Sequence, residues 1–284
     1  MSTTKSPPLD GPIGIFDSGL GGLTVASAIA EVRPGQSLIY LGDTARVPYG
    51  NRSPATVVRY ARNNVAFLKG HKVGLVVVAC NTVSAQGLGG LVDGDPTPVV
   101  GVIRPGARAA LRASRGGAIA VLGTRGTIRS DAYLHAIHEL DPGREVIQLP
   151  CPLFVPLVEE GWADHEVTRA VVDTYLAPLK GTAVDTIILG CTHYPLLKGV
   201  LRAVVDDVLG SEVALVDSAT AVAEVVSELV RPGDVALGER RFFVTDEPSR
   251  TAELGARFWA LSNVEARAAI DFEHVDVEDQ GRQR

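Results

Sequence analysis

Cysteine is scarce in this sequence, with only three in 284 residues: Cys80, Cys151 and Cys191. So small and odd a number excludes a disulfide framework, and no two cysteines form a C-x-x-C pair for zinc or redox chemistry. Long apolar runs are also absent, since the longest covers residues 75–80, far short of the roughly 20 that span a bilayer. Residues 1–12 lack the apolar region of a secretory signal. We therefore expect a cytoplasmic protein with no membrane partner.

Basic clusters and nucleotide motifs are missing as well. The 27 basic residues are outnumbered by 33 acidic ones, giving a formal charge of -6, and no Lys/Arg block could follow a phosphate backbone. No G-x-x-x-x-G-K-[ST] loop occurs. The glycine-rich turn at 17–22 departs from the dinucleotide fingerprint, because Thr24 stands where the third glycine belongs. The sequence therefore predicts neither a nucleic-acid partner nor a nucleotide cofactor.

What the sequence does contain is a regular alternation of short apolar runs with longer amphipathic stretches. The sequence has 46% hydrophobic and 21% charged residues. The alternation is typical of an α/β fold with buried parallel strands. Helices are expected over 22–31 and 54–69, each ended by glycine. The expected strands cover residues 13–16, 37–41, 75–79, 98–103, 118–122, 145–149, 186–189 and 213–216.

The two halves of the sequence resemble each other. The segment LVVVACNT at 75–82 aligns with TIILGCTH at 186–193, which places Cys80 on Cys191. Turns and strands on either side of these segments also match. The number of residues that separates each matching pair increases slowly along the chain, as insertions in loops would cause. Any two doubly wound domains share strand spacing, but spacing alone does not require a cysteine after both third strands. Duplication is the better explanation.

This duplication predicts the domain organisation. We expect two similar doubly wound α/β domains related by pseudo-twofold symmetry, with the active site in the cleft between them. The first domain is expected to contain residues 10–102 and 211–270, the second residues 103–210, and flexible tails residues 1–9 and 271–284.

Chemistry is expected where the strands of a parallel sheet end, because ligands bind beyond their carboxyl ends. Cys80 begins the sequence CNT and Cys191 begins CTH, each after a third strand. We predict the following helices to begin near Ser84 and at Pro195. A thiol facing a helix N-terminus has a stabilised thiolate, so both thiol pKa values are expected to lie below the usual value of about 8.5.

A single buried cysteine usually packs as a small hydrophobic residue, and Cys151 in PCPLF fits that description. Two cysteines at equivalent positions need another explanation. A Cys-His hydrolase needs one nucleophile with its base, and a redox enzyme needs cysteines within disulfide distance. A pair facing one cleft suits a third reaction: one thiolate removes a proton from a carbon while the other thiol protonates its opposite face, which is racemisation. A two-domain binding protein that clamps an amino acid unchanged is the non-enzymatic alternative.

Five motifs carry a family resemblance: DSGLGGL, GDTARVPYG, ACNT, CPLFVPLVEEG and GCTHYPL. Together they resemble the glutamate racemases of the cofactor-independent aspartate/glutamate racemase superfamily, from about Pro12 to beyond Val216. The resemblance implies interconversion of L- and D-glutamate, which supplies D-glutamate for peptidoglycan.

The resemblance also implies roles for individual residues. Cys80 would deprotonate D-glutamate, with Asp17 nearby, and Cys191 would deprotonate L-glutamate, with His193 and either Glu159 or its neighbour nearby. Short polar side chains would hold the α-carboxylate beside the thiols, and a second group would hold the side-chain carboxylate. The residues expected to bind substrate are Asp17, Ser18, Tyr49, Gly50, Asn81, Thr82, Thr124, Thr192 and His193.

No cofactor and no metal are expected. A pyridoxal enzyme needs a Schiff-base lysine, whereas the five lysines occur in tail or helix settings that indicate solvation. The resemblance implies a homodimer. It also permits a regulatory role toward DNA gyrase, as in some bacterial relatives.

Overall fold

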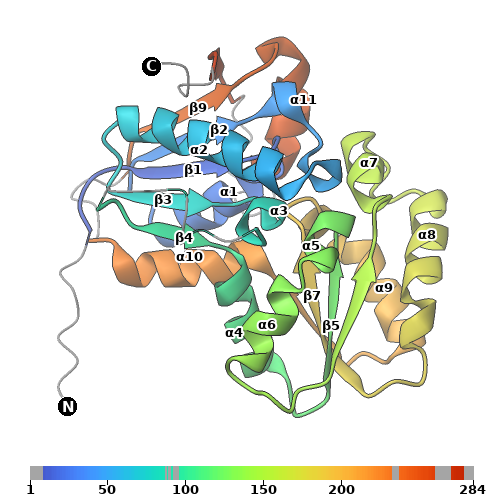
Figure 1. The fold of residues 1–284 in the computed structure, drawn as a ribbon. Helices are drawn as coiled ribbons and strands as arrows, with labels where there is room; N and C mark the ends of the chain where they lie inside the picture. Colours follow the sequence, from blue (N-terminus) through green and yellow to red (C-terminus); the bar gives the residue numbers. More distant parts are fainter. Residues whose placement is uncertain are drawn as a thin grey trace, which may run out of the picture.

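The computed structural model contains two parallel β-sheets, each covered by helices on both faces (Figure 1). It describes residues 9–86, 88, 91, 96–231, 237–259 and 270–277. The expected α/β architecture with two domains is confirmed.

The first sheet has the strand order β10-β9-β2-β1-β3-β4. Its strands are β1 (Ile13–Asp17), β2 (Leu38–Gly42), β3 (Leu75–Val78), β4 (Val99–Gly101), β9 (Arg240–Val244) and β10 (Phe272–His274). The second sheet has the order β6-β5-β7-β8. Its strands are β5 (Ala118–Gly123), β6 (Val146–Pro150), β7 (Val184–Gly190) and β8 (Ala214–Asp217). The order β2-β1-β3-β4 is thus repeated as β6-β5-β7-β8, as a duplication predicts, and β3 corresponds to β7.

Helices connect these strands and cover the sheets. The longer ones are α1 (Leu23–Val32), α2 (Pro54–Gly70), α4 (Ile103–Ala113), α8 (Glu166–Leu176), α9 (Lys198–Val208), α10 (Ser218–Leu229) and α11 (Pro248–Trp259). The shorter ones are α3 (Asn81–Ser84), α5 (Arg125–Arg129), α6 (Ala132–His138) and α7 (Phe154–Glu159). The 3-10 turns of the described residues are η1 (Thr44–Arg46), η2 (Tyr49–Asn51), η3 (Ala177–Leu179) and η4 (Tyr194–Leu197). Within the described part of the chain, no helix is both long and apolar enough to cross a membrane.

Side-chain alternation along the strands explains why helices lie on both faces of the first sheet. Ile13 and Ile15 belong to the core cluster that contains α1 and α10, whereas Phe16 packs with the apolar side chains of α2. Residues on both faces are fully buried, so the strands consist of nearly continuous apolar runs.

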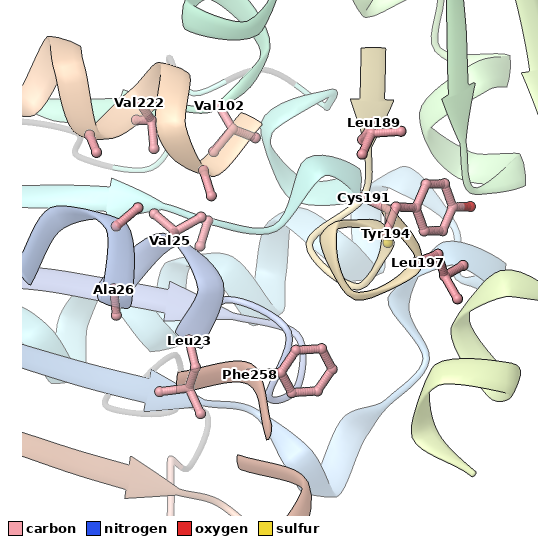
Figure 2. Packing of buried hydrophobic residues seen from close by; sticks show 14 of the residues in the cluster. Leu23, Val25, Ala26, Val102, Leu189, Cys191, Tyr194, Leu197, Val222 and Phe258 are labelled. Atoms are coloured by element: carbon pink, nitrogen blue, oxygen red, sulfur yellow. The ribbon is translucent and has the colours of Figure 1, made fainter. Parts of the chain in front are cut away.

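One core cluster continues from the first domain into the second (Figure 2). It joins Leu23 of α1 and Val222 of α10 to Leu189 of β7 and Leu197 of η4, and it includes Cys191. The end of β7 is therefore held against the first domain by buried apolar surface, which fixes one thiol relative to the other half of the protein.

The structure revises the sequence prediction at two places in the C-terminal part. The prediction assigned residues from 211 onward to the first domain, but β8 pairs with β7 in the second sheet. Among the described elements that follow, α10, β9, α11 and β10 return to the first domain. The prediction also placed residues 271–284 in a tail, whereas β10 pairs in parallel with β9. Residues 1–8 and 278–284 of the predicted tails lie outside the described residues.

Candidate active site

The two thiols occupy equivalent places at the carboxyl ends of β3 and β7. Cys80 is the N-cap of α3, and Cys191 follows Gly190, the last residue of β7. Both side chains are buried, at 5% and 6% exposure, and the pKa of Cys80 is raised first by this burial, with a smaller contribution from Cys191. The predicted helix starts need correction: α3 begins at Asn81 rather than near Ser84, and a 3-10 turn from Tyr194 precedes α9.

Asp17 and Ser18, which follow β1, lie beside Cys80. The Cys80 thiol donates to Ser18 Oγ at 3.4 Å. Asp17 Oδ2 accepts from the Gly19 amide at 3.2 Å, whereas Oδ1 is buried without a hydrogen-bond partner. Burial raises the pKa of this carboxyl above its usual value. Asp17 therefore offers a buried acceptor for an ammonium group.

The expectation of a lowered pKa is wrong for Cys80. Burial, followed by repulsion from the Asp17 carboxylate, raises its pKa to about 12. The hydrogen bonds that Cys80 shares with Ser18 and with the Val83 backbone lower this pKa, but they are outweighed. The four residues of α3 supply too little of a helix dipole to offset these effects. Cys80 in this structure is a neutral thiol, which is a proton donor.

A different arrangement surrounds Cys191. Its Sγ lies 4.0 Å from Nδ1 of His193, and Nε2 of His193 lies 3.0 Å from Oε1 of Glu159. Burial alone would lower the pKa of His193, but its interactions with Cys191 and Glu159 raise it to about 10. Of the two glutamates that the sequence left open, Glu159 forms the contact with His193.

The predicted carboxylate-binding residues form contacts between the two domains. Thr82 Oγ1 lies 3.1 Å from Thr124 Oγ1, which is equally close to Thr127 Oγ1. A Cβ built on Gly50 would lie 3.5 Å from Thr124 Oγ1. The hydroxyls after β3 and β5 and the backbone of η2 thus meet at one place, where the two domains contact each other.

Other predicted residues have identifiable partners. The Thr192 carbonyl accepts from Thr24 Oγ1 at 3.2 Å. Tyr49 is buried and its hydroxyl donates to Asp43 and accepts from the Asn64 amide at 3.4 Å. The Tyr49 hydroxyl is therefore engaged within the first domain, and only its backbone is left for a ligand.

Comparison with known proteins supplies the family. The Asp/Glu/Hydantoin racemase family model matches residues 23–226, which is more than half of the chain. The chain belongs to the Asp/Glu/Hydantoin racemase family. It is 50% identical over 251 residues to a glutamate racemase of Geobacter metallireducens, covering 87% of this chain and 92% of that protein.

Solved structures of this racemase family agree with the comparison of sequences. A glutamate racemase isoform of Bacillus anthracis has a TM-score of 0.85 at 38% identity, covering 94% of this chain and 97% of that one. A glutamate racemase of Francisella tularensis, solved with D-glutamate, has a TM-score of 0.83 at 32% identity, covering 94% and 98%. The fold described here is therefore that of glutamate racemases.

Sequence reasoning missed three residues that contact the site. Ser218 begins α10 and accepts from Asn81 Nδ2 at 3.3 Å, a place that the rule of strand ends could have identified. Tyr133 donates to Asn81 Oδ1 at 2.7 Å. Phe258 of α11 packs edge-on against the His193 ring, with ring centroids 4.9 Å apart. Neither Tyr133 nor Phe258 lies in a family motif noted above, and α11 has no equivalent in the duplicated pattern.

Among the residues that the structure describes, no group of three or more His, Cys, Asp or Glu side chains is placed to hold a metal ion.

Gly21 of the first domain lies against the two residues that follow Cys191 in the second. A Cβ at this position would clash with Thr192 Oγ1 and would lie 2.5 Å from His193 Nδ1. We expect Gly21→Ala to push these residues away from the first domain, to destabilise the protein by about 1–3 kcal/mol and to lower racemase activity more than roughly tenfold.

Gly199→Ala is the matched control for this substitution. Gly199 lies in α9, and a Cβ there would meet nothing within 4 Å, so the change is expected to stabilise the protein by about 0.5–1 kcal/mol. Urea unfolding and initial racemisation rates measure both variants. Equal behaviour of the two alanine variants would contradict the packing described for Gly21.

Proposed function

We propose that this chain interconverts L- and D-glutamate by moving a proton at Cα between Cys80 and Cys191. The observation that supports the proposal is the pair of buried thiols at equivalent strand ends of two similar domains, each with its own polar neighbour. A carbon held between the thiols would exchange its proton on opposite faces, which inverts the centre.

On this proposal, Cys191 removes the Cα proton of L-glutamate and Cys80 donates a proton to the other face. His193 is positively charged at neutral pH, so it stabilises negative charge that develops on Cys191. The raised pKa of Cys80 keeps its proton available for donation. The reverse reaction exchanges the two roles.

Asp17 couples substrate binding to the reactivity of Cys80. Its unpartnered Oδ1 would accept the substrate ammonium group. Neutralising this carboxylate removes one of the influences that raise the pKa of Cys80, so bound D-glutamate would help to form the thiolate that deprotonates it. Binding of the ammonium group and formation of the thiolate both use only groups of this chain and of its substrate.

Glutamate fits this arrangement better than aspartate. We propose that Asn81, Thr82 and Thr192 hold the α-carboxylate, while Ser18, Thr124 and the backbone of Tyr49 and Gly50 hold the side-chain carboxylate. Aspartate is one methylene shorter and would leave one carboxylate group without its donors, which is expected to lower kcat/KM by at least about tenfold.

Circular dichroism of either glutamate enantiomer, incubated with purified protein under reducing conditions, tests this function. Loss of the signal toward zero at equal rates with and without added chelator is the expected result. An unchanged signal would refute the proposed activity, and binding without a signal change would favour the amino-acid binding protein instead. If activity disappears in chelator, the racemase function still holds, but the expectation that no metal is required is refuted.

The proposal extends to the cellular role. D-glutamate produced in the cytoplasm would serve peptidoglycan synthesis and thereby the cell wall and cell shape, and the enzyme would act as a homodimer. The similarity to glutamate racemases over most of the chain supports this role.

A further inference from the structure

Tyr133 is a buried side chain of α6 that reaches the ends of both thiol-bearing strands. It is 0% exposed. A Cβ built on Gly190 would lie 3.1 Å from Tyr133 Cε2, and one built on Gly106 of α4 would lie 3.2 Å from its hydroxyl. Both glycines thus leave room for the ring, and Gly190 directly precedes Cys191.

The hydroxyl of Tyr133 reaches across to the residue that follows the other cysteine. It donates to Asn81 Oδ1 at 2.7 Å, and Asn81 directly follows Cys80. The second domain supplies Tyr133, and the first supplies Asn81. One side chain therefore contacts the residue before Cys191 and the residue after Cys80.

The Asn81 amide is fixed from two sides. Its Oδ1 accepts from Tyr133, and its Nδ2 donates to Ser218 Oγ at 3.3 Å. Burial raises the pKa of Tyr133 above its usual value, so the hydroxyl remains a donor throughout the working pH range. Nδ2 carries two N–H groups, and Ser218 engages one of them, which leaves one donor for a ligand.

We propose that Tyr133 is a positioning residue that sets the separation of the two thiols and the orientation of the Asn81 amide. This inference rests on the proposed racemase function. Tyr133 acts through Asn81 and Gly190 and does not touch the substrate. A racemase needs both bases in line with one carbon, so a rigid contact shared by both strand ends has a direct effect on proton transfer.

The consequence of losing the hydroxyl follows from the chemistry of an amide. In Tyr133→Phe, Asn81 Oδ1 becomes a buried acceptor with no donor, and the amide is no longer held in one of its two orientations. We expect kcat/KM for glutamate to fall about tenfold. A loss of this size corresponds to the contribution of one buried hydrogen bond that keeps the site ordered.

A double-mutant cycle distinguishes positioning from general stabilisation. If Tyr133 acts through Asn81, the Tyr133→Phe change should have little further effect on kcat/KM in an Asn81→Ala background. Multiplicative losses in the double variant would overturn the inference, because they would show that the two residues act independently.

Tyr194→Phe is the matched control. Tyr194 is equally buried and donates a single hydroxyl hydrogen bond, at 2.9 Å to the Cys151 carbonyl. Both phenylalanine variants are expected to lower the unfolding midpoint to a similar extent, but only Tyr133→Phe should lower kcat/KM about tenfold. Equal kcat/KM in the two variants would overturn the inference about Tyr133. It would not affect the proposed racemase function, which the activity of the wild-type protein tests.

A substrate-free measurement separates this inference from the proposed function. If the wild-type protein does not racemise glutamate, the function fails, and iodoacetamide alkylation followed by mass spectrometry still tests the contact. Tyr133→Phe is expected to change the alkylation rates of Cys80 and Cys191 severalfold and to leave Cys151 unchanged. Unaltered rates at both cleft thiols would contradict the positioning role.

Discussion

Cys80→Ser and Cys191→Ser are each expected to lower kcat/KM for glutamate about 10³-fold or more in both directions. Inversion needs one group to accept a proton and another to donate one, and a serine hydroxyl is a far weaker base than a thiolate. The two enantiomers have equal free energy, so kcat/KM must be the same in both directions for any variant. Racemisation rates therefore cannot assign a thiol to an enantiomer.

A glutamate analogue with a leaving group on Cβ makes that assignment. Elimination needs only the base that removes the Cα proton, so each variant should retain it for one enantiomer. Cys80→Ser is expected to process the L-analogue through Cys191, and Cys191→Ser the D-analogue through Cys80. Equal loss for both enantiomers in both variants would mean that the thiols work as one unit or only maintain the fold.

Cys151→Ser is the control for both thiol variants. Cys151 is buried in the core and its thiol donates weakly to the Leu149 carbonyl at 3.5 Å. A serine hydroxyl can form the same hydrogen bond, so this variant is expected to racemise glutamate at close to the wild-type rate.

His193→Asn is expected to reduce racemisation about 100-fold, the second largest effect. Asparagine removes the positive charge beside Cys191, and with it the stabilisation of negative charge on that sulfur. Elimination from the L-analogue should therefore suffer more than elimination from the D-analogue. Equal losses for the two analogues would contradict the pairing of His193 with Cys191.

The same histidine gives stability a predictable pH dependence. Its pKa in the folded protein, about 10, lies above the unfolded value of about 6.5. The stabilisation is therefore complete below about pH 6.5 and is lost progressively as pH rises toward about 10. Urea unfolding at several pH values should show this loss in wild type and not in His193→Asn.

His135→Asn serves as the control for the pH measurement, because His135 is an exposed histidine of α6. Its stability curve should follow that of the wild-type protein. The wild-type curve also contains the titration of Cys80, whose pKa is raised, so the difference between wild type and His193→Asn isolates the histidine. A difference that does not change with pH would contradict the charged state assigned to His193.

Much of the fold could be predicted because its buried strands are visible in the sequence as short apolar runs. The internal repeat also placed Cys80 and Cys191 at equivalent strand ends, and the structure agrees. The repeat could not predict β9 and β10, since they extend only the first sheet. It also misplaced the return to the first domain, because β8 completes the second sheet before α10 crosses back.

The electrostatics of the site were less predictable than its position. A helix start after Cys80 suggested a lowered pKa, but the sequence does not show how deeply the thiol is buried or that the Asp17 carboxylate adds to the effect. Contacts between distant segments were equally hidden. Phe258 reaches His193 from 65 residues further along the chain, and Tyr133 reaches Asn81 from the other domain.

The central claim, two bases on opposite faces of one carbon, is tested most directly by early racemisation of unlabelled L-glutamate in heavy water. The account predicts that D-glutamate carries deuterium at Cα from the first turnovers, because the Cys80 thiol exchanges with heavy water and delivers a deuteron. The remaining L-glutamate should stay unlabelled at low conversion, because Cys191 acts on the other face. D-glutamate that retains the original hydrogen, together with deuterium in recovered L-glutamate, would indicate a single base and contradict the account.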